Sequence, residues 1–205
     1  MDTKKKILDA ALTLFSEKGY GNVYVGHIAD AVGIKAPSLY KHYKSKQDIF
    51  DAILEEMKKS YEKQAGNLGM NGNSIDMDGN LFSTIPEDKL VEMGTGLFLY
   101  FLHDDYTQKF RKMLTIEQFH NSELAGLYSK QYLDDPLQYQ TGLFSLISTG
   151  GKLKQYDSNM MALQFYSPIY MLLTLCDRQP DREPEALQML EQHIRQFSRV
   201  YKEEA

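Results

Sequence analysis

The stretch Ile28–Lys46, IADAVGIKAPSLYKHYKSK, decides the fold that we predict for the amino-terminal part of the chain. Ile28, Ala29 and Val32 recur at a spacing that places side chains on one face of a helix, and Ala29 is small enough for a close helix contact. Gly33 follows, and glycine ends a helix readily because it adopts the left-handed backbone conformation without steric penalty. We therefore expect a short helix that ends in a sharp turn.

A second short helix is expected from Pro37 to Tyr43, directly after that turn. Proline is favourable in the first turn of a helix, where an N–H group would have no partner. Leu39 and Tyr43 are four residues apart and can both point inward. The polar side chains left on the outside suit the base edges and phosphates of a DNA major groove. These outer residues are Lys35, Ser38, Tyr40, Lys41 and His42.

Helical patterns flank this pair on both sides. Upstream, apolar residues recur at helical spacing from Thr3 to Lys18, and Gly19 follows as a stop. Downstream, Ser45 can cap a fourth helix. Short helix pairs joined by glycine also occur in helical proteins that never bind nucleic acid, but the flanking helices favour a helix-turn-helix that contacts DNA.

The motifs of this region occur in a specific order. They are ILDAALTLF, Gly19-Tyr20, Ile28-Ala29, Val32-Gly33-Ile34, Ser38-Leu39-Tyr40, Tyr43 and Ser45-Lys46. In this order they resemble the N-terminal domain of the tetracycline-repressor (TetR) family. The resemblance implies an all-α fold, and the helical patterns along the chain predict about nine helices. A three-helix helix-turn-helix DNA-binding domain over residues 1–46 would precede a larger helical domain over residues 47–205 for effector binding and dimerisation.

The resemblance also implies roles for individual residues. Residues at the recognition-helix positions contact DNA in such proteins, and the equivalent of Lys46 holds a phosphate at the start of the fourth helix. With Lys41 as a further cation, the predicted DNA-binding residues are Lys35, Ala36, Ser38, Tyr40, Lys41, His42 and Lys46.

One departure from the family pattern concerns the second helix. Family members commonly begin it with Thr or Ser hydroxyls, whereas this chain has Val23 and Tyr24, and Asn22 is the only nearby capping side chain. Gly26 costs that helix about 1 kcal/mol relative to alanine. Two alternatives remain for Tyr24, a phosphate contact or packing.

The charge of the chain is unevenly distributed. The 205 residues carry a net charge of −5, yet residues 1–50 hold 8 lysines and 5 acidic residues, a net +3, which leaves −8 for the rest. The cationic part can therefore approach DNA while the acidic part stays off it, with an affinity that falls as salt rises.

Patterns typical of enzymes and metal sites are missing from the sequence. The five histidines form no i, i+4 pair with a glutamate, and Gly94-Thr95-Gly96 lacks the third glycine of a dinucleotide site. Cys176, the single cysteine, fits a reducing cytoplasm, and the apolar run Phe165–Cys176 is too short to cross a bilayer. We expect a cytoplasmic protein with no catalytic residue, no cofactor, no metal and no membrane association.

The larger domain is predicted to be helical apart from one segment. Helical patterns cover residues 87–103, 106–120, 122–149, 158–178 and 183–201. Residues 66–85 are rich in Gly, Asn and Asp, and we predict a long flexible loop there, either an ordered lid or a disordered segment.

The last two helices carry an association signal, because their apolar residues step by three and four as in helix bundles. The resemblance implies that these helices pair with their symmetry mates, so that a homodimer places two recognition helices on a palindromic operator. The predicted dimer interface is Phe165, Pro168, Leu172, Leu187, Leu190, Ile194, Phe197 and Tyr201.

An effector pocket is implied by the same resemblance. Pro168 is expected to bend its helix and help to form a cavity, which Met and aromatic side chains would line. The candidate lining is Tyr61, Met93, Phe101, Met113, Tyr139, Phe144 and Tyr166, for which ordinary core packing is the alternative.

The expected function is that of a transcriptional regulator, most simply a repressor that binds a double-stranded DNA operator as a homodimer and is released by an unidentified small-molecule effector. The alternative is a helical ligand- or protein-binding dimer that has lost specific operator binding. The departures at Val23, Tyr24 and Gly26 motivate this alternative.

Overall fold

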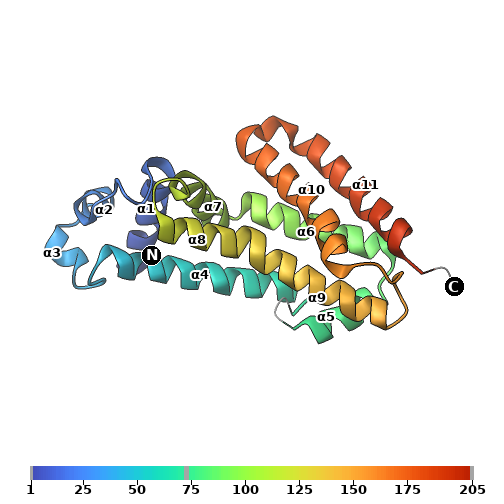
Figure 1. The fold of residues 1–205 in the computed structure, drawn as a ribbon. Helices are drawn as coiled ribbons and strands as arrows, with labels where there is room; N and C mark the ends of the chain where they lie inside the picture. The colour runs from blue at the N-terminus through green and yellow to red at the C-terminus, as the bar shows by residue number, and fades with distance from the viewer. Residues whose placement is uncertain (1, 72–73, 204–205) are drawn as a thin grey trace. The chain divides into compact units, whose positions relative to one another are not determined.

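The computed structural model describes residues 2–71 and 74–203, and all regular elements among them are helices (Figure 1). The α-helices are α1 (Thr3–Lys18), α2 (Val25–Val32), α3 (Ala36–Leu39), α4 (Lys46–Asn67), α5 (Ile75–Phe82), α6 (Glu87–His103), α7 (Asp105–Glu117), α8 (Ser122–Ser129), α9 (Asp135–Thr149), α10 (Ser158–Arg178) and α11 (Glu183–Tyr201). The predicted all-α fold is confirmed. Within the described part of the chain, no helix is long and apolar enough to span a membrane.

The chain forms two compact units. The first unit comprises residues up to Tyr61 together with Asp104–Lys130, and the second comprises Glu62–His103 together with the residues from Gln131 onward. The first unit thus adds α7, α8 and most of α4 to the segment predicted as the DNA-binding domain. The domain boundary between residues 46 and 47 stays a prediction.

The first unit is organised around the contact between α1 and α7. The apolar stripe of α1 is buried as its spacing predicts, with Ile7 and Phe15 fully inaccessible to solvent. From α7, Phe110 and Met113 are equally inaccessible, and the Phe110 ring lies 5.7 Å from the ring centroid of Phe50 on α4. Three helices that are distant in sequence therefore share one core.

In the second unit, α10 and α11 lie side by side and both pack on α6 (Figure 1). Leu172 and Leu190 are the most buried leucines of this core, and Phe98 of α6 packs with them. Arg195 on α11 also forms ion pairs with Glu87 at 3.0 Å and Asp88 at 2.7 Å at the start of α6. Hydrogen bonding from Arg195 lowers the pKa of Glu87.

The prediction of a loop over residues 66–85 is wrong for α5, although residues 72–73 lie outside the described residues. The Ser74 hydroxyl caps this helix by accepting from the Met77 N–H. A Cβ atom on Gly142 of α9 would lie 2.6 Å from Ile75, so the glycine permits close packing of α5 on α9. This tertiary contact outweighs the poor helix propensity of the segment.

The predicted single helix over residues 122–149 is interrupted. A π-helical segment, Lys130–Asp134, separates α8 from α9, and Pro136 stands in the first turn of α9. Because proline has no N–H group, the regular hydrogen-bond pattern cannot continue through this point. With α5, this interruption raises the helix number above the nine expected.

Removal of a side chain from the shared core should destabilise the protein strongly. We expect Phe110→Ala to lower the free energy of unfolding by about 3–5 kcal/mol, because a fully buried aromatic leaves a cavity. The exposed Gln108, two residues earlier on α7, supplies the control, and Gln108→Ala should change it by less than about 0.5 kcal/mol. Chemical denaturation measures both. Equal values for the two variants would contradict this account of the core.

Candidate nucleic-acid interface

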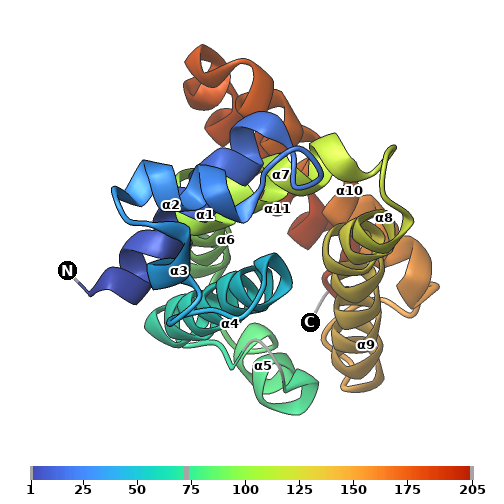
Figure 2. The same ribbon diagram turned by 90° about the vertical axis from the view of Figure 1, so that its left-hand side faces the viewer.

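The turn after α2 has the geometry that its sequence predicts. Gly33 adopts a left-handed conformation with φ of 75°, and the N–H of Ile34 donates to the carbonyl of Ala29 at 3.0 Å. Only glycine takes this conformation without strain, which explains the residue. The turn directs the chain from α2 into α3; α2 packs on α1, and α3 packs on α2 (Figure 2).

The second helix of the pair is shorter than predicted, since regular α-helix covers only Ala36–Leu39. Beyond it, the N–H of Lys41 donates to Ser38 and that of His42 to Leu39, a tighter i to i−3 pattern. Leu39 is fully buried and Tyr43 is 9% exposed, so their predicted inward orientation is confirmed.

The outer face of this segment carries the predicted DNA-binding side chains. Lys35, Tyr40 and Lys41 are exposed, with Tyr40 accessible over 51% of its surface. Ala36, Ser38 and His42 are partly exposed. Base-edge donors and two cations are thus available to solvent on α3 and the residues that flank it, while their contacts with DNA stay predictions.

Lys46 has a different environment from the other lysines of this region. Its Nζ atom donates to the carbonyl oxygens of Tyr20 at 2.8 Å and Val23 at 3.0 Å, and it lies 4.1 Å from the Tyr20 ring centroid. Burial lowers the pKa of this ammonium, while the negative charge of Glu117 acts in the opposite direction. Two of its three N–H donors therefore stabilise the turn between α1 and α2.

The start of α4 is capped as the sequence predicts. The Ser45 hydroxyl accepts from the N–H of Asp48 at 3.0 Å, and the Asp48 carboxylate accepts from the N–H of Lys44 at 3.0 Å. This reciprocal arrangement fixes the first turn of the helix, from which Lys46 extends.

Two residues that the sequence analysis missed act on the turn before α2. His27 supplies a cap, because its Nδ1 atom accepts from the N–H of Tyr24 at 3.3 Å. Asn22, expected as the cap of α2, instead donates to Lys18 at the end of α1.

Glu117 is the second of these residues, and it accepts from the N–H of Gly21 at 3.0 Å across 96 residues of sequence. The spacing of Tyr24 and His27 could have indicated this cap from the sequence, whereas no sequence feature indicates the contact between Glu117 and Gly21.

The residues predicted to line an effector pocket are divided between the two units. Tyr61 and Met113 belong to the first unit, and the other five belong to the second. In the second unit Met93 and Phe144 are buried in the core, and Phe101 packs against it. The hydroxyl of Tyr139 donates to Asp78 at 2.5 Å, and that of Tyr166 donates to the carbonyl of Tyr132 at 2.8 Å. Packing within the protomer accounts for these contacts.

Half of the predicted dimer residues are buried in the interior of the second unit. Leu172, Leu190, Ile194 and Phe197 are at most 9% exposed, which leaves them little surface for a partner. The remaining four are partly buried; they are Phe165, Pro168, Leu187 and Tyr201.

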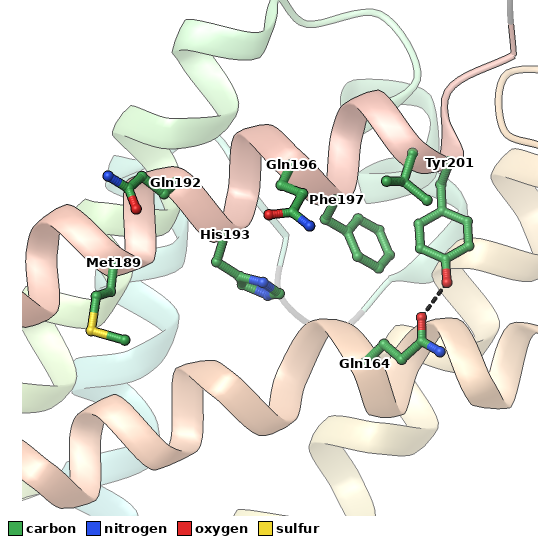
Figure 3. A pocket seen from close by; sticks show the side chains of 8 residues that line it. Gln164, Met189, Gln192, His193, Gln196, Phe197 and Tyr201 are labelled. Carbon is green, nitrogen blue, oxygen red and sulfur yellow. Dashed lines mark hydrogen bonds between the residues drawn. The ribbon is translucent and has the colours of Figure 1, made fainter.

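A different line of side chains on α10 and α11 faces solvent. Its large apolar members are 41–53% exposed and are Met160, Leu163, Met171, Met189 and Val200. A groove of about 410 Å³ runs along this face, bordered by Gln164 of α10 and by Gln192 and Gln196 of α11 (Figure 3). At one end the Tyr201 hydroxyl bonds to Gln164. We define these five apolar residues, with the groove, as the α10–α11 face.

Cys176 is a core residue, as its sequence neighbours suggest. It is 2% exposed, and burial raises the pKa of its thiol. A raised pKa disfavours the reactive thiolate.

Comparison with known proteins bears on the first unit most directly. Residues 7–53 match the family described as bacterial regulatory proteins, tetR family. The HTH-type transcriptional regulator AcrR of Shigella flexneri is 29% identical over 125 residues, 61% of this chain and 52% of AcrR. The biofilm operon negative transcriptional regulator IcaR of Staphylococcus epidermidis is 48% identical over 52 residues, 25% of this chain and 28% of IcaR. The chain thus spans about half the length of the first relative and about a quarter of the second.

Solved structures extend the similarity of fold to nearly the whole chain. SmeT, the repressor of the Stenotrophomonas maltophilia multidrug efflux pump SmeDEF, has a TM-score of 0.65 at 17% identity, covering 100% of this chain and 93% of SmeT. A regulator from Saccharomonospora viridis in complex with choline has a TM-score of 0.65 at 21% identity, covering 98% of each chain. The predicted resemblance is confirmed: the helix-turn-helix segment of this chain matches the tetR family of bacterial regulatory proteins, and its all-helical fold is similar to that of a solved TetR-family regulator.

Proposed function

We propose that this protein is a DNA-binding transcriptional regulator that acts by binding and not by catalysis. The observation that carries the proposal is the exposed face of α3 and the following turn, which the left-handed Gly33 turn presents. Tyr40 and His42 would contact base edges in the major groove, and Lys35 and Lys41 would neutralise phosphates. A reducing cytoplasm, expected from the single cysteine, is the compartment in which it would act.

The proposed assembly is a homodimer formed through the α10–α11 face. Met160, Leu163 and Met171 recur at helical spacing on α10, and Met189 and Val200 do so on α11. Gln192 and Gln196 lie between Met189 and Val200 on α11. They can form hydrogen bonds across a two-fold axis, where each residue meets its own equivalent. Two copies of α3 would then address the two halves of a palindromic operator.

Repression and release by an effector complete the proposal. IcaR is named a negative regulator and SmeT a repressor, and a complex of SmeT with triclosan has a TM-score of 0.65 at 17% identity. By analogy, a small molecule bound in the second unit would favour a dimer geometry that no longer matches the operator. Titration of small molecules against the operator complex tests this part, and failure of every compound to change DNA affinity would remove it alone.

DNA selection from random duplexes at low salt should recover a palindromic sequence. On that sequence, Tyr40→Ala should reduce the preference over a mismatched duplex by about tenfold, because a lost base contact removes discrimination. Lys41→Ala should weaken binding to every sequence and reduce the salt slope by about one per half-site. Fluorescence anisotropy at several salt concentrations measures both effects.

The control for DNA binding is Lys112→Ala, which removes an exposed lysine of α7 outside the helix-turn-helix. It should leave both preference and salt slope unchanged. Wild-type protein that shows no preference over random DNA would instead support a helical dimer without operator binding.

Charge placed on the α10–α11 face should separate the protomers. We expect Leu163→Glu to raise the dimer dissociation constant about tenfold or more, because a carboxylate would be buried against its own symmetry mate. Met77→Glu, on the exposed side of α5, is the matched control and should leave the dimer intact. Sedimentation equilibrium reports both. A Leu163→Glu protein that stays dimeric would place the interface elsewhere.

A further inference from the structure

The turn between α1 and α2 is held from two sides by side chains of other helices. From α4, Lys46 donates to the carbonyls of Tyr20 and Val23. From the end of α7, Glu117 accepts from the N–H of Gly21, which lies between those two carbonyls in sequence. The backbone N–H of the turn is therefore bonded by an acidic side chain, and its carbonyl groups are bonded by a basic one.

Glu117 makes this contact from a buried position. Its side chain is only 4% exposed, so an unpaired carboxylate there would be costly. The backbone N–H of Gly21 and the nearby ammonium of Lys46 compensate for that cost. An exposed glutamate would be solvated by water and would need neither partner, so the burial of Glu117 makes both contacts necessary.

The sequence of the turn is adapted to this carboxylate. Gly19 has φ of 81°, which disfavours residues other than glycine, and a Cβ atom on it would lie 2.5 Å from the Glu117 Oε1 atom. A side chain at position 19 would thus push Glu117 away from Gly21. Space and backbone conformation both require glycine here.

The opposite end of α7 is attached to the first unit independently. The Tyr106 hydroxyl donates to Asp9 of α1, and the Ser60 hydroxyl of α4 lies 3.4 Å from Asp104. These contacts involve neither the turn nor α2. They provide an internal comparison for the contact made by Glu117.

We propose that Glu117 is a positioning residue for DNA binding, which holds the turn before α2 through the Gly21 N–H and so fixes α2 and α3 relative to α4. The proposal rests on the proposed function, because it assigns a role in operator recognition. α7 follows α6 of the second unit directly in sequence, so the contact also gives α7 a direct connection to the DNA-reading helices.

Three variants test this role in the full-length protein. Glu117→Ala removes the acceptor and should weaken operator binding on the order of tenfold at temperatures where the protein is fully folded. Glu117→Gln retains an acceptor oxygen and should restore affinity to within about threefold of wild type. Tyr106→Phe removes the contact at the other end of α7 and should lower the melting temperature while leaving operator affinity within about twofold.

Three outcomes of the measurements on these variants would overturn the proposal. They are wild-type affinity in folded Glu117→Ala, failure of Glu117→Gln to restore binding, and an equal loss of affinity in Tyr106→Phe. The last would show that any destabilisation of the first unit weakens DNA binding, with no specific role for the turn.

Hydrogen exchange separates this proposal from the proposed function, because it needs no DNA. The Gly21 amide should exchange about tenfold faster in Glu117→Ala than in Glu117→Gln, whereas amides in the middle of α1 should be unchanged. Unchanged exchange at Gly21 would overturn the positioning role even if the protein binds an operator. Faster exchange in a protein that binds no operator would instead show that the proposed function had failed while the contact was real.

Discussion

The burial of α7 against α1 is the contact on which the helix-turn-helix depends. α2 and α3 together are too short to bury a core of their own, so their fully buried side chains, Ile28 and Leu39, need surface from other helices, and α2 packs on α1. α7, with Phe110 and Met113 fully buried, supports α1 in turn. The DNA-reading segment thus owes its shape to residues about seventy positions away in sequence.

Polar contacts fix the conformation of the turn before α2, which apolar packing alone does not. Hydrophobic packing brings α7 close but does not fix the turn before α2, since burial is nearly independent of orientation. The donors of Lys46 and the acceptor of Glu117 are directional, and together they select one conformation of the turn. Lys46 therefore contributes to the shape of the unit, whatever its remaining N–H donor contacts.

Local signals in the sequence predicted the elements that local interactions decide. The bounds of α1 follow from its apolar spacing and from Gly19, and the turn after α2 follows from the conformational freedom of Gly33. The structure differs where long-range packing decides the outcome: α5 forms because Gly142 admits Ile75, and Glu117 meets Gly21 because two helices pack together. The predicted dimer interface was subject to the same restriction. Apolar residues spaced by three and four predict that a helix face is buried, but they do not say whether α6 or a second protomer packs against it. The placement of Leu190 and Ile194 in the protomer core illustrates this ambiguity.

The division of the first unit into two stretches of chain affects how the protein is made. Residues up to Tyr61 leave the ribosome long before Asp104–Lys130, which supply α7 and α8. Until then, Phe50 lacks its partner Phe110 and α1 lacks the packing surface of α7, so the nascent helix-turn-helix exposes apolar surface. Contacts between residues so far apart in sequence form late in folding because closing the intervening chain costs entropy. The stretch up to Tyr61 is therefore completed only after Asp104–Lys130 has been synthesised.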